Sequence, residues 1–566
     1  MRIAFATAVA CLSISGLSAS QGASAAAGDY ESLVGLSNDW RQFAKPAITN
    51  CVPDYTTAAM AKKAQELKGY QSRLDAIDTQ GWPQSQQIDY QLFKAELNGM
   101  DFDMRVLKPW ARDPTFYASV WSEQSDVPEH EGPSSEPIIN LYEFSYPLPK
   151  ADQKKLTCLL GAVPAVLEQA KINLKDSTAR DLWVYGTRAF REQSKMLAEL
   201  EAGTLSLRTL AGRVPANLKG ADKSLVSAVR KARQATDGFR QWLDAEAPAK
   251  QGPSGVGKQN YDWYMKNVHL VPYTWEQQAT LLRRELERSR ASLALEEFRN
   301  RNLPQLEPVA NAAAFQALAD AKMKKIVDFL IDAGIVPDKP YYRDAMEQQK
   351  GAYTPPAETN FFSNTTVRNP LGLYSHNYHW IELARIKSEP NASPIRSLTP
   401  VSDMYDSRSE GLATALEEIL LHAGLYDDEP RGREIVWIML ANRAARGLAS
   451  LYVQSNEITA AQAGVFHARW TPRKWSDPAS DLVAFEQLIY LRQPGYGTSY
   501  VTGKMLVDRL MSDYSARLEA QGKPFELSDF FRQLNAAGIM PYPLIEAEMV
   551  KSPRNVGVPV ASGDDR

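Results

Sequence analysis

The sequence predicts a mostly α-helical fold, and two observations lead to this expectation. Long stretches carry apolar residues at three- and four-residue spacing, which places them on one face of a helix, and they contain few β-branched runs. One stretch begins with a capping box, in which Thr274 precedes the helix and Gln277 follows three residues later. The predicted helices span residues 156–174, 178–200, 225–245, 274–300, 312–333, 411–425, 431–454 and 503–521.

The strand signal is small. Residues 360–367 are aromatic and β-branched, and they lie between Pro356 and Pro370. An edge strand beside the neighbouring helix is one interpretation of this segment, and a plain loop is the other.

Glycine, proline and serine concentrate in residues 250–257, which form the strongest break between helical blocks. We therefore expect an N-terminal helical region of residues 26–250 and a C-terminal helical region of residues 258–551, which could still share one core. Residues 552–566 contain proline and glycine and predict a flexible tail.

Composition excludes some classes of partner. The chain has 566 residues, of which 44% are hydrophobic and 23% charged, so it can bury a large core. The net charge of −3 and the absence of a Lys/Arg block give no reason to expect nucleic acid or an anionic membrane surface as a partner.

The N-terminus has the pattern of an export signal. Arg2 supplies the positive start, residues 3–17 the apolar run, and Ala23-Ser24-Ala25 the cleavage site. We expect residues 1–25 to be removed and the mature protein to be periplasmic or secreted. No other segment approaches 18 uninterrupted apolar residues, so no membrane span is expected in the mature chain.

The cysteines bear on the same compartment. Of the three cysteines, only Cys51 and Cys158 remain after cleavage of the signal. An even pair in an oxidising compartment predicts one disulfide, and two separately buried thiols are the alternative.

The histidines give the first indication of chemistry. Among six histidines, His376 and His379 are three residues apart, which brings them onto one face of a helix. Glu382 follows three residues later, and Glu410 lies further along the chain. On a straight helix Glu382 would point about 240° away from His376, so a bend is needed for all of them to converge.

This set resembles a zinc hydrolase centre that has been altered. A His-Glu-x-x-His centre uses two imidazoles as ligands and the glutamate after the first histidine as general base. That position holds Asn377, whose amide cannot act as a base at neutral pH. Ordinary zinc proteolysis is therefore not expected.

Nearly the whole mature chain resembles the bacterial family named domain of unknown function 885, whose members look like gluzincin metallopeptidases. One specific match is the Gln493-Pro494-Gly495 turn, which feeds a helix that bears Tyr500. The other matching segments are residues 88–93, 107–114, 257–264, 410–411 and 426–428. The resemblance implies a multi-helix gluzincin-like architecture with a small β element near an active-site cleft.

The family's metal motif is His-Glu-x-x-Pro-Gly-His, with Glu-Gly-Trp-Ala about 34 residues after its first histidine. His376 and Glu410 have this spacing, and Glu382 occupies the place of the second histidine. The resemblance thus implies the metal ligands His376, Glu382 and Glu410. This oxygen-rich set would weaken the preference for zinc relative to manganese or magnesium. The alternative is that Glu382 is an exposed or Arg385-paired helix residue and no metal is bound.

Residue type and position predict the remaining site residues. His379, Tyr500 and Arg492 are the predicted catalytic residues, with His379 as base, Tyr500 as donor to an oxyanion and Arg492 as a clamp for a substrate carboxylate. The predicted substrate-binding residues are His269, Arg408 and Asn377.

Together these expectations describe an exported, divergent metal-dependent hydrolase that acts on small molecules or short peptides. The alternative is a pseudoenzyme that binds a peptide or ligand in the cleft without turnover.

Overall fold

The computed structural model describes residues 29–128 and 132–550. The predicted signal peptide and the tail of residues 552–566 lie outside the described residues. Within the described part the chain is mostly α-helical with a few short strands, which confirms the predicted fold class.

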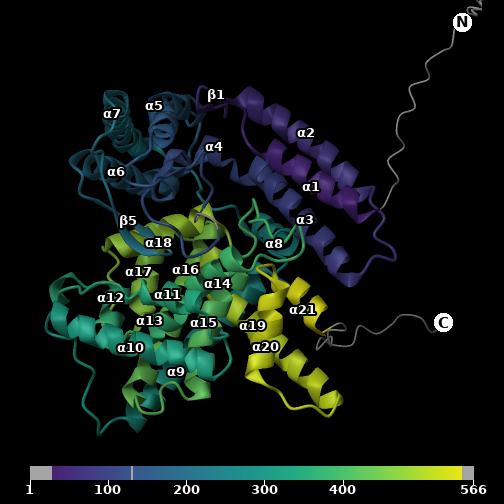
Figure 1. Ribbon diagram of the computed structural model, residues 1–566, viewed down its shortest axis with the longest axis vertical. Helices are drawn as coiled ribbons and strands as arrows, with labels where there is room; N and C mark the ends of the chain where they lie inside the picture. Colours follow the sequence, from purple (N-terminus) through teal and green to yellow (C-terminus); the bar gives the residue numbers. More distant parts are fainter. Residues whose placement is uncertain (1–28, 129–131, 551–566) are drawn as a thin grey trace, which may run out of the picture.

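The N-terminal half forms two groups of helices (Figure 1). The first group contains α1 (Tyr30–Ala44), α2 (Thr57–Asp75) and α3 (Gln84–Phe102), none of which was among the helices predicted from periodicity. The second contains α5 (Lys150–Asn173), α6 (Arg180–Ala202) and α7 (Lys223–Glu246), which pack around a hydrophobic core of their own. The short helix α4 (Pro109–Arg112) connects the two groups.

The C-terminal half is built on long central helices. Helix α16 packs against α9, and α15 packs against α19. The helices of this half are α8 (Lys258–Asn267), α9 (Trp275–Arg299), α10 (Ala312–Asp332), α11 (Pro340–Glu347), α12 (Phe361–Thr366), α13 (Leu371–His376), α14 (Tyr378–Ser388), α15 (Asp406–Ala423), α16 (Pro430–Gln454), α17 (Ala460–Trp470), α18 (Asp481–Arg492), α19 (Tyr496–Ala520), α20 (Leu527–Ala537) and α21 (Tyr542–Val550).

All the helices predicted from apolar spacing are present, and the capping box at Thr274 is confirmed. Helices α5, α15 and α19 begin five or more residues earlier than periodicity indicated. Helix α15 starts at Asp406 and α19 at Tyr496, so Glu410 and Tyr500 both lie in the opening turns of helices.

Both interpretations of residues 360–367, the edge strand and the loop, are wrong, because this segment forms helix α12. The Asn360 side chain accepts a hydrogen bond from the Ser363 backbone N–H, and the Ser363 hydroxyl accepts one from Asn360 in return. This reciprocal capping box satisfies the first turn and outweighs the β propensity of the aromatic and branched residues.

The strands lie elsewhere. They form the antiparallel pair β1 (Ile48–Thr49) and β2 (Val52–Pro53), the parallel pair β3 (Val120–Trp121) and β4 (Ile139–Asn140), and the hairpin β5 (Leu205–Thr209) and β6 (Gly212–Ala216). The hairpin reaches the C-terminal half, where the Arg208 guanidinium lies 4.7 Å above the Trp380 ring of α14.

The two halves share buried surface. One hydrophobic core contains Trp40 and Phe93 from the N-terminal half together with Leu282 and Met439 from the C-terminal half. In the predicted linker, a Cβ added at Gly255 would lie 2.4 Å from the backbone oxygen of Val453, so only glycine allows this approach to α16. The division near residue 250 remains an expectation.

No helix in residues 29–128 or 132–550 combines the length and apolar character that a membrane crossing requires.

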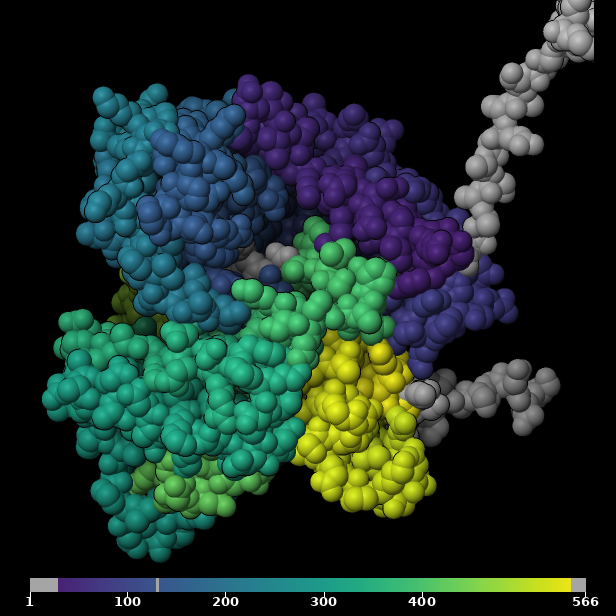
Figure 2. Space-filling model, in the orientation of Figure 1, coloured from purple at the N-terminus to yellow at the C-terminus, as the bar shows by residue number. Residues whose placement is uncertain are grey.

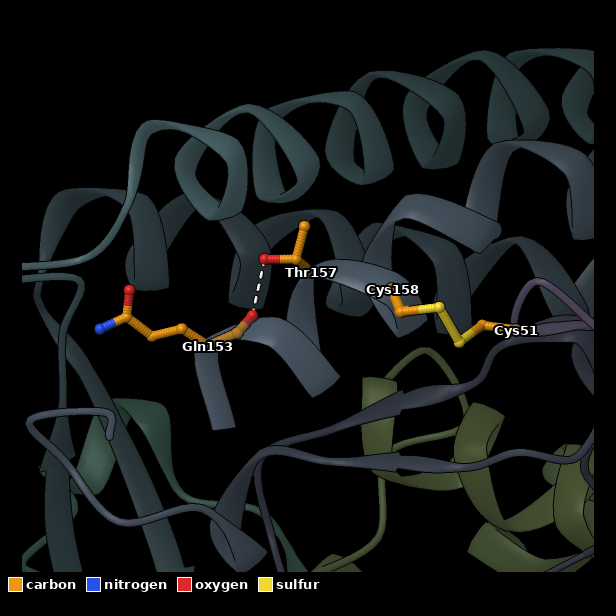
Figure 3. The surroundings of a disulfide bond; sticks show 4 residues. All are labelled: Cys51, Gln153, Thr157 and Cys158. Carbon is orange, nitrogen blue, oxygen red and sulfur yellow. Dashed lines mark hydrogen bonds between the residues drawn. A yellow bond between two sulfur atoms is a disulfide. The ribbon is translucent and has the colours of Figure 1, made fainter. Parts of the chain in front are cut away.

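A disulfide joins Cys51, at the turn between β1 and β2, to Cys158 on α5 (Figure 3). Beside it, the Thr157 hydroxyl donates a hydrogen bond of 2.6 Å to the Gln153 backbone oxygen. Of the two alternatives for the cysteines, the disulfide is therefore the one that the structure contains.

The disulfide closes a loop with a sequence separation of 107 residues, so its removal should cost stability. Loop-closure entropy for about 100 residues predicts a loss of about 4–5 kcal/mol in the free energy of unfolding of a Cys51→Ser/Cys158→Ser variant. Chemical denaturation of the oxidised wild type and of the variant measures this difference. Equal unfolding midpoints would contradict the assigned role.

Candidate metal centre

His376, His379 and Glu410 come together in the C-terminal half. Each offers one ligand atom, and these atoms all lie within 4.8 Å of one another. The Nε2 atom of His376 lies 3.1 Å from Oε2 of Glu410, and Nε2 of His379 lies 3.3 Å from the same oxygen. Both imidazoles thus direct the same ring nitrogen toward a single carboxylate oxygen.

A break between two helices aims the histidines at one point. His376 is the last residue of α13, Asn377 has a ψ of 2°, and α14 begins at Tyr378. The two imidazole rings lie at 88° to each other with centroids 4.9 Å apart. A bend between His376 and Glu382 is therefore present, as their convergence would have required. It brings His376 and His379 together and does not bring in Glu382.

Glycines bring the helix of Glu410 close to α19. A Cβ added at Gly411 would lie 2.4 Å from the Cα of Gly503, so only glycine at these positions allows the two backbones to touch. At the start of α19, Gly495 has a φ of 97°, which forms the turn after Pro494. The Tyr496 hydroxyl then donates a hydrogen bond of 2.7 Å to Oε1 of Glu410.

A buried ion pair lies behind His376. Oε1 of Glu417 and Nη2 of Arg443 each lie 3.2 Å from Nδ1 of His376, and Arg443 is paired with Glu417 at 2.5 Å. Glu417 follows Glu410 by seven residues on α15, so both project from the same face of that helix. A carboxylate on the far ring nitrogen fixes the orientation of a metal-binding imidazole.

The charges in the cluster depend on one another. Burial lowers the pKa of His379, but the charge of Glu410 and its hydrogen bond outweigh burial and raise this pKa to about 9. Burial raises the pKa of Glu410, but the two histidines outweigh it and hold the pKa well below its usual range. The Asp126 carboxylate also raises the pKa of His379, which places a residue of the N-terminal half near the cluster.

Glu382 does not join this cluster. Its Oε1 lies 2.8 Å from Nη2 of Arg408, and both side chains are buried. Arg408 therefore pairs with Glu382 and not with Glu410, although it is only two residues from Glu410 in sequence. The predicted ligand set of His376, Glu382 and Glu410 therefore does not come together. His379 lies beside His376 and Glu410 in the position expected for Glu382.

Asn377 and Tyr500 lie beside the cluster. The Asn377 amide donates a hydrogen bond of 3.1 Å to the Gln349 backbone oxygen. The Tyr500 ring stacks on His376 with centroids 6.1 Å apart, and the Arg446 guanidinium lies 4.2 Å from the Tyr500 ring centroid.

Arg492 and His269 have other surroundings. Arg492 donates from Nε to Asp113 at 2.6 Å and from Nη2 to the Pro133 oxygen at 2.5 Å, so it links α18 to the N-terminal half. His269 is buried against Tyr264, and burial lowers its pKa to about 3. The substrate roles predicted for these two residues remain predictions.

Four residues near the cluster were missed by the sequence analysis: Asp126, Glu417, Arg443 and Tyr496. The seven-residue spacing of Glu417 from Glu410 is a signal that could have been used. The position of Asp126 depends on tertiary packing over a long sequence separation, which no local pattern indicates.

Residues 46–549 match the model of DUF885, a family described as bacterial protein of unknown function. The chain belongs to this family. No curated protein matches the sequence.

Two solved structures have a similar fold. One is described as a putative lipoprotein of unknown function from Shewanella oneidensis, with a TM-score of 0.61 and 14% identity over 92% of this chain and 98% of that one. The other is described as the putative lipoprotein from Colwellia psychrerythraea, with a TM-score of 0.64 and 12% identity over the same shares of the two chains. At this identity the likeness concerns the fold alone.

Proposed function

We propose that His376, His379 and Glu410 hold one divalent metal and that the protein is an exported metal-dependent hydrolase for small molecules or short peptides. The observation that carries the proposal is the convergence of three ligand atoms within 4.8 Å. Two imidazoles and one carboxylate are the protein ligands of many catalytic zinc sites, which leave a fourth position open.

The residues present fit such a metal. Both Nε2 atoms face Glu410, while Nδ1 of His376 faces Glu417. This arrangement leaves one nitrogen of each ring for the metal and gives one ring a carboxylate partner behind it. With His379 in place of Glu382, the set has two nitrogens and one oxygen, which favours zinc over manganese or magnesium.

A divalent metal held there would supply Lewis-acid polarisation of a substrate carbonyl. Tyr496 holds the Glu410 carboxylate through its hydroxyl, so only one carboxylate oxygen is left to face the histidines. Tyr500 covers one face of His376 and keeps the ring in place.

Asn377 occupies the position of the general base in the family motif but cannot accept a proton, so another residue must do so. Among the described residues, Asp126 is the carboxylate of the N-terminal half whose charge reaches His379. We assign it the role of proton acceptor in place of the glutamate that the family motif carries.

Metal affinity should rise with pH. Against the effect of burial, the Glu410 carboxylate raises the pKa of His379 from its ordinary 6.5 to about 9, so the folded, metal-free protein keeps this proton until the pH approaches 9. The stability that the proton gives to the metal-free form is fully present below pH 6.5 and is lost as the pH rises through 9. Zinc must displace that proton, so affinity should increase about tenfold per pH unit between pH 6.5 and pH 8.5. Calorimetry in buffers of different ionisation heat measures the released proton. Affinity that is flat over this range would contradict the shifted pKa.

Glu417 should act as a positioning residue for His376. We expect Glu417→Gln to lower zinc affinity about 10–100-fold, the usual cost of losing a carboxylate behind a metal-bound imidazole. The matched control is Glu486→Gln, because Glu486 is also buried, pairs with Arg446 at 2.6 Å and lies near His467. An equal loss of zinc affinity in both variants would mean that Glu417 acts only through stability.

Hydrolysis tests the enzymatic part of the proposal. Zinc-loaded protein should cleave members of a panel of dipeptides and small amides and esters, and His376→Ala should abolish this activity. Asp126→Asn should lower kcat while zinc stays bound at unchanged stoichiometry. Protein that binds zinc but cleaves no member of the panel would overturn the hydrolase assignment and leave the metal site intact.

A further inference from the structure

A second feature of interest is a cavity between the two halves of the chain. It has a volume of about 190 Å³ and lies between α2, α3 and the segments of residues 132–138, 401–403 and 492–493. Figure 2 shows one face of the molecule hollowed where the purple and blue N-terminal helices meet the green segment. None of the residues lining this cavity belongs to the His376, His379 and Glu410 cluster.

Most of the cavity wall is apolar. The apolar side chains that line it include Met60, Met100, Met104, Leu107, Trp110 and Phe116. Small-molecule sites typically combine such walls with a few convergent polar groups. Drug-sized ligands need cavities of about 300–1,000 Å³, so this space suits a smaller molecule.

Two carboxyl groups face the cavity from opposite halves, Asp103 from the π-helical turn after α3 and Asp403 from the segment before α15. Among the described residues, no group donates a hydrogen bond to the Asp103 carboxyl and no cation pairs with it. Burial and the charge of Asp403 raise the pKa of Asp103 to about 8, and burial raises that of Asp403 to about 7. A cation placed between them would favour the ionised form of both.

The basic groups at the cavity have other partners. Lys63 donates to the backbone oxygens of Ala44 and Lys45, each at 2.7 Å. Arg492 pairs with Asp113, although its charge still lowers the pKa of Asp403. Glu136 adds a third carboxyl group to the lining. The cavity therefore has more acidic groups than its own cations satisfy.

We propose that this cavity binds a small organic ammonium compound, with the ammonium between Asp103 and Asp403 and the apolar body against the methionines and aromatic rings. A metal ion fits less well. Among the described residues, the grouping of three or more ligand atoms suited to a metal is at His376, His379 and Glu410, and hard cations require about six oxygen ligands. The apolar side chains of the cavity wall would supply no ligand atoms to such an ion.

Matched probes test the class of ligand on the full protein. Phenethylamine carries an ammonium on an apolar body, 2-phenylethanol replaces the charge with a hydroxyl, and calcium chloride supplies a cation without an apolar part. Calorimetry should give saturable binding of phenethylamine with a Kd below about 1 mM, and at least tenfold weaker binding of the alcohol. Equal binding of amine and alcohol, or saturable binding of calcium at this site without binding of the amine, would overturn the proposal.

Two variants locate the site. Asp103→Asn should weaken phenethylamine binding at least about tenfold, because it removes one charge-assisted hydrogen bond, and Asp403→Asn should do the same. Both are close in size to the wild-type residue, and circular dichroism checks that they fold. Asp529→Asn, at the larger cavity of about 1210 Å³, is the control and should leave binding unchanged. Unchanged affinity in both cavity variants would place the amine elsewhere and refute the proposal.

Discussion

Replacing His379 by alanine is expected to reduce zinc affinity about 100–1000-fold. Structural zinc sites with four ligands have a binding free energy of about 10–16 kcal/mol, which is about 2.5–4 kcal/mol per ligand. The loss of one ligand should therefore weaken binding by about this amount. His379 holds its Nε2 3.3 Å from Glu410, and it is buried, so no solvent-exposed group can take its place without rearrangement. Competition against a chromophoric chelator measures the affinity of each variant.

The matched control is His467→Ala. His467 is also buried, but its Nε2 lies 2.8 Å from the Asn442 amide, away from the cluster. This variant should retain wild-type zinc affinity within about threefold. If His379→Ala bound zinc as tightly as His467→Ala, the assignment of His379 as a ligand would fail, and the Glu382 alternative would have to be reconsidered.

Glu382→Gln is expected to cause a large loss of stability from a single substitution in the core. This change leaves the Arg408 guanidinium buried without its carboxylate, 2.8 Å from a neutral amide. Loss of one partner of a buried ion pair costs about 3–5 kcal/mol, because the remaining charge is not compensated. Denaturant unfolding should show this loss, while the zinc affinity of the folded fraction stays within about threefold of the wild type.

Removal of both charges tests whether the loss of stability in Glu382→Gln comes from the unpaired Arg408 charge. A Glu382→Leu/Arg408→Met variant replaces the ion pair with apolar groups of comparable length, and such replacements are often neutral or stabilising. We expect it to recover most of the stability lost in Glu382→Gln. A double variant less stable than the single one would show that Arg408 contributes through contacts other than its pair with Glu382.

The fold was predictable where local sequence decides the structure. Apolar spacing predicts long helices such as α9 and α16, and the structure contains the capping box predicted at Thr274. Local propensity gives the wrong structure for residues 360–367, because the capping box of Asn360 and Ser363 outweighs the β propensity of the residues between and after them. Helices α1 to α3 were missed, and α15 and α19 begin earlier than expected.

The candidate site was predictable only in part, for a geometric reason. His376 and Glu410 have the spacing of the family's metal motif, so the resemblance pointed to two members of the cluster, and the three-residue step from His376 indicated that His379 shares its face. The choice between His379 and Glu382 depended on the helix break at Asn377 and on Arg408, which attracts Glu382 across the interior. Neither contact leaves a pattern in the local sequence.

Metal analysis of protein purified without a histidine tag shows whether His376, His379 and Glu410 form a metal site. After incubation with zinc and removal of the excess, the wild type should retain about one equivalent per chain, and His376→Ala should retain none. Metal-free wild-type protein under these conditions, or equal zinc content in the folded His376→Ala variant, would contradict the account.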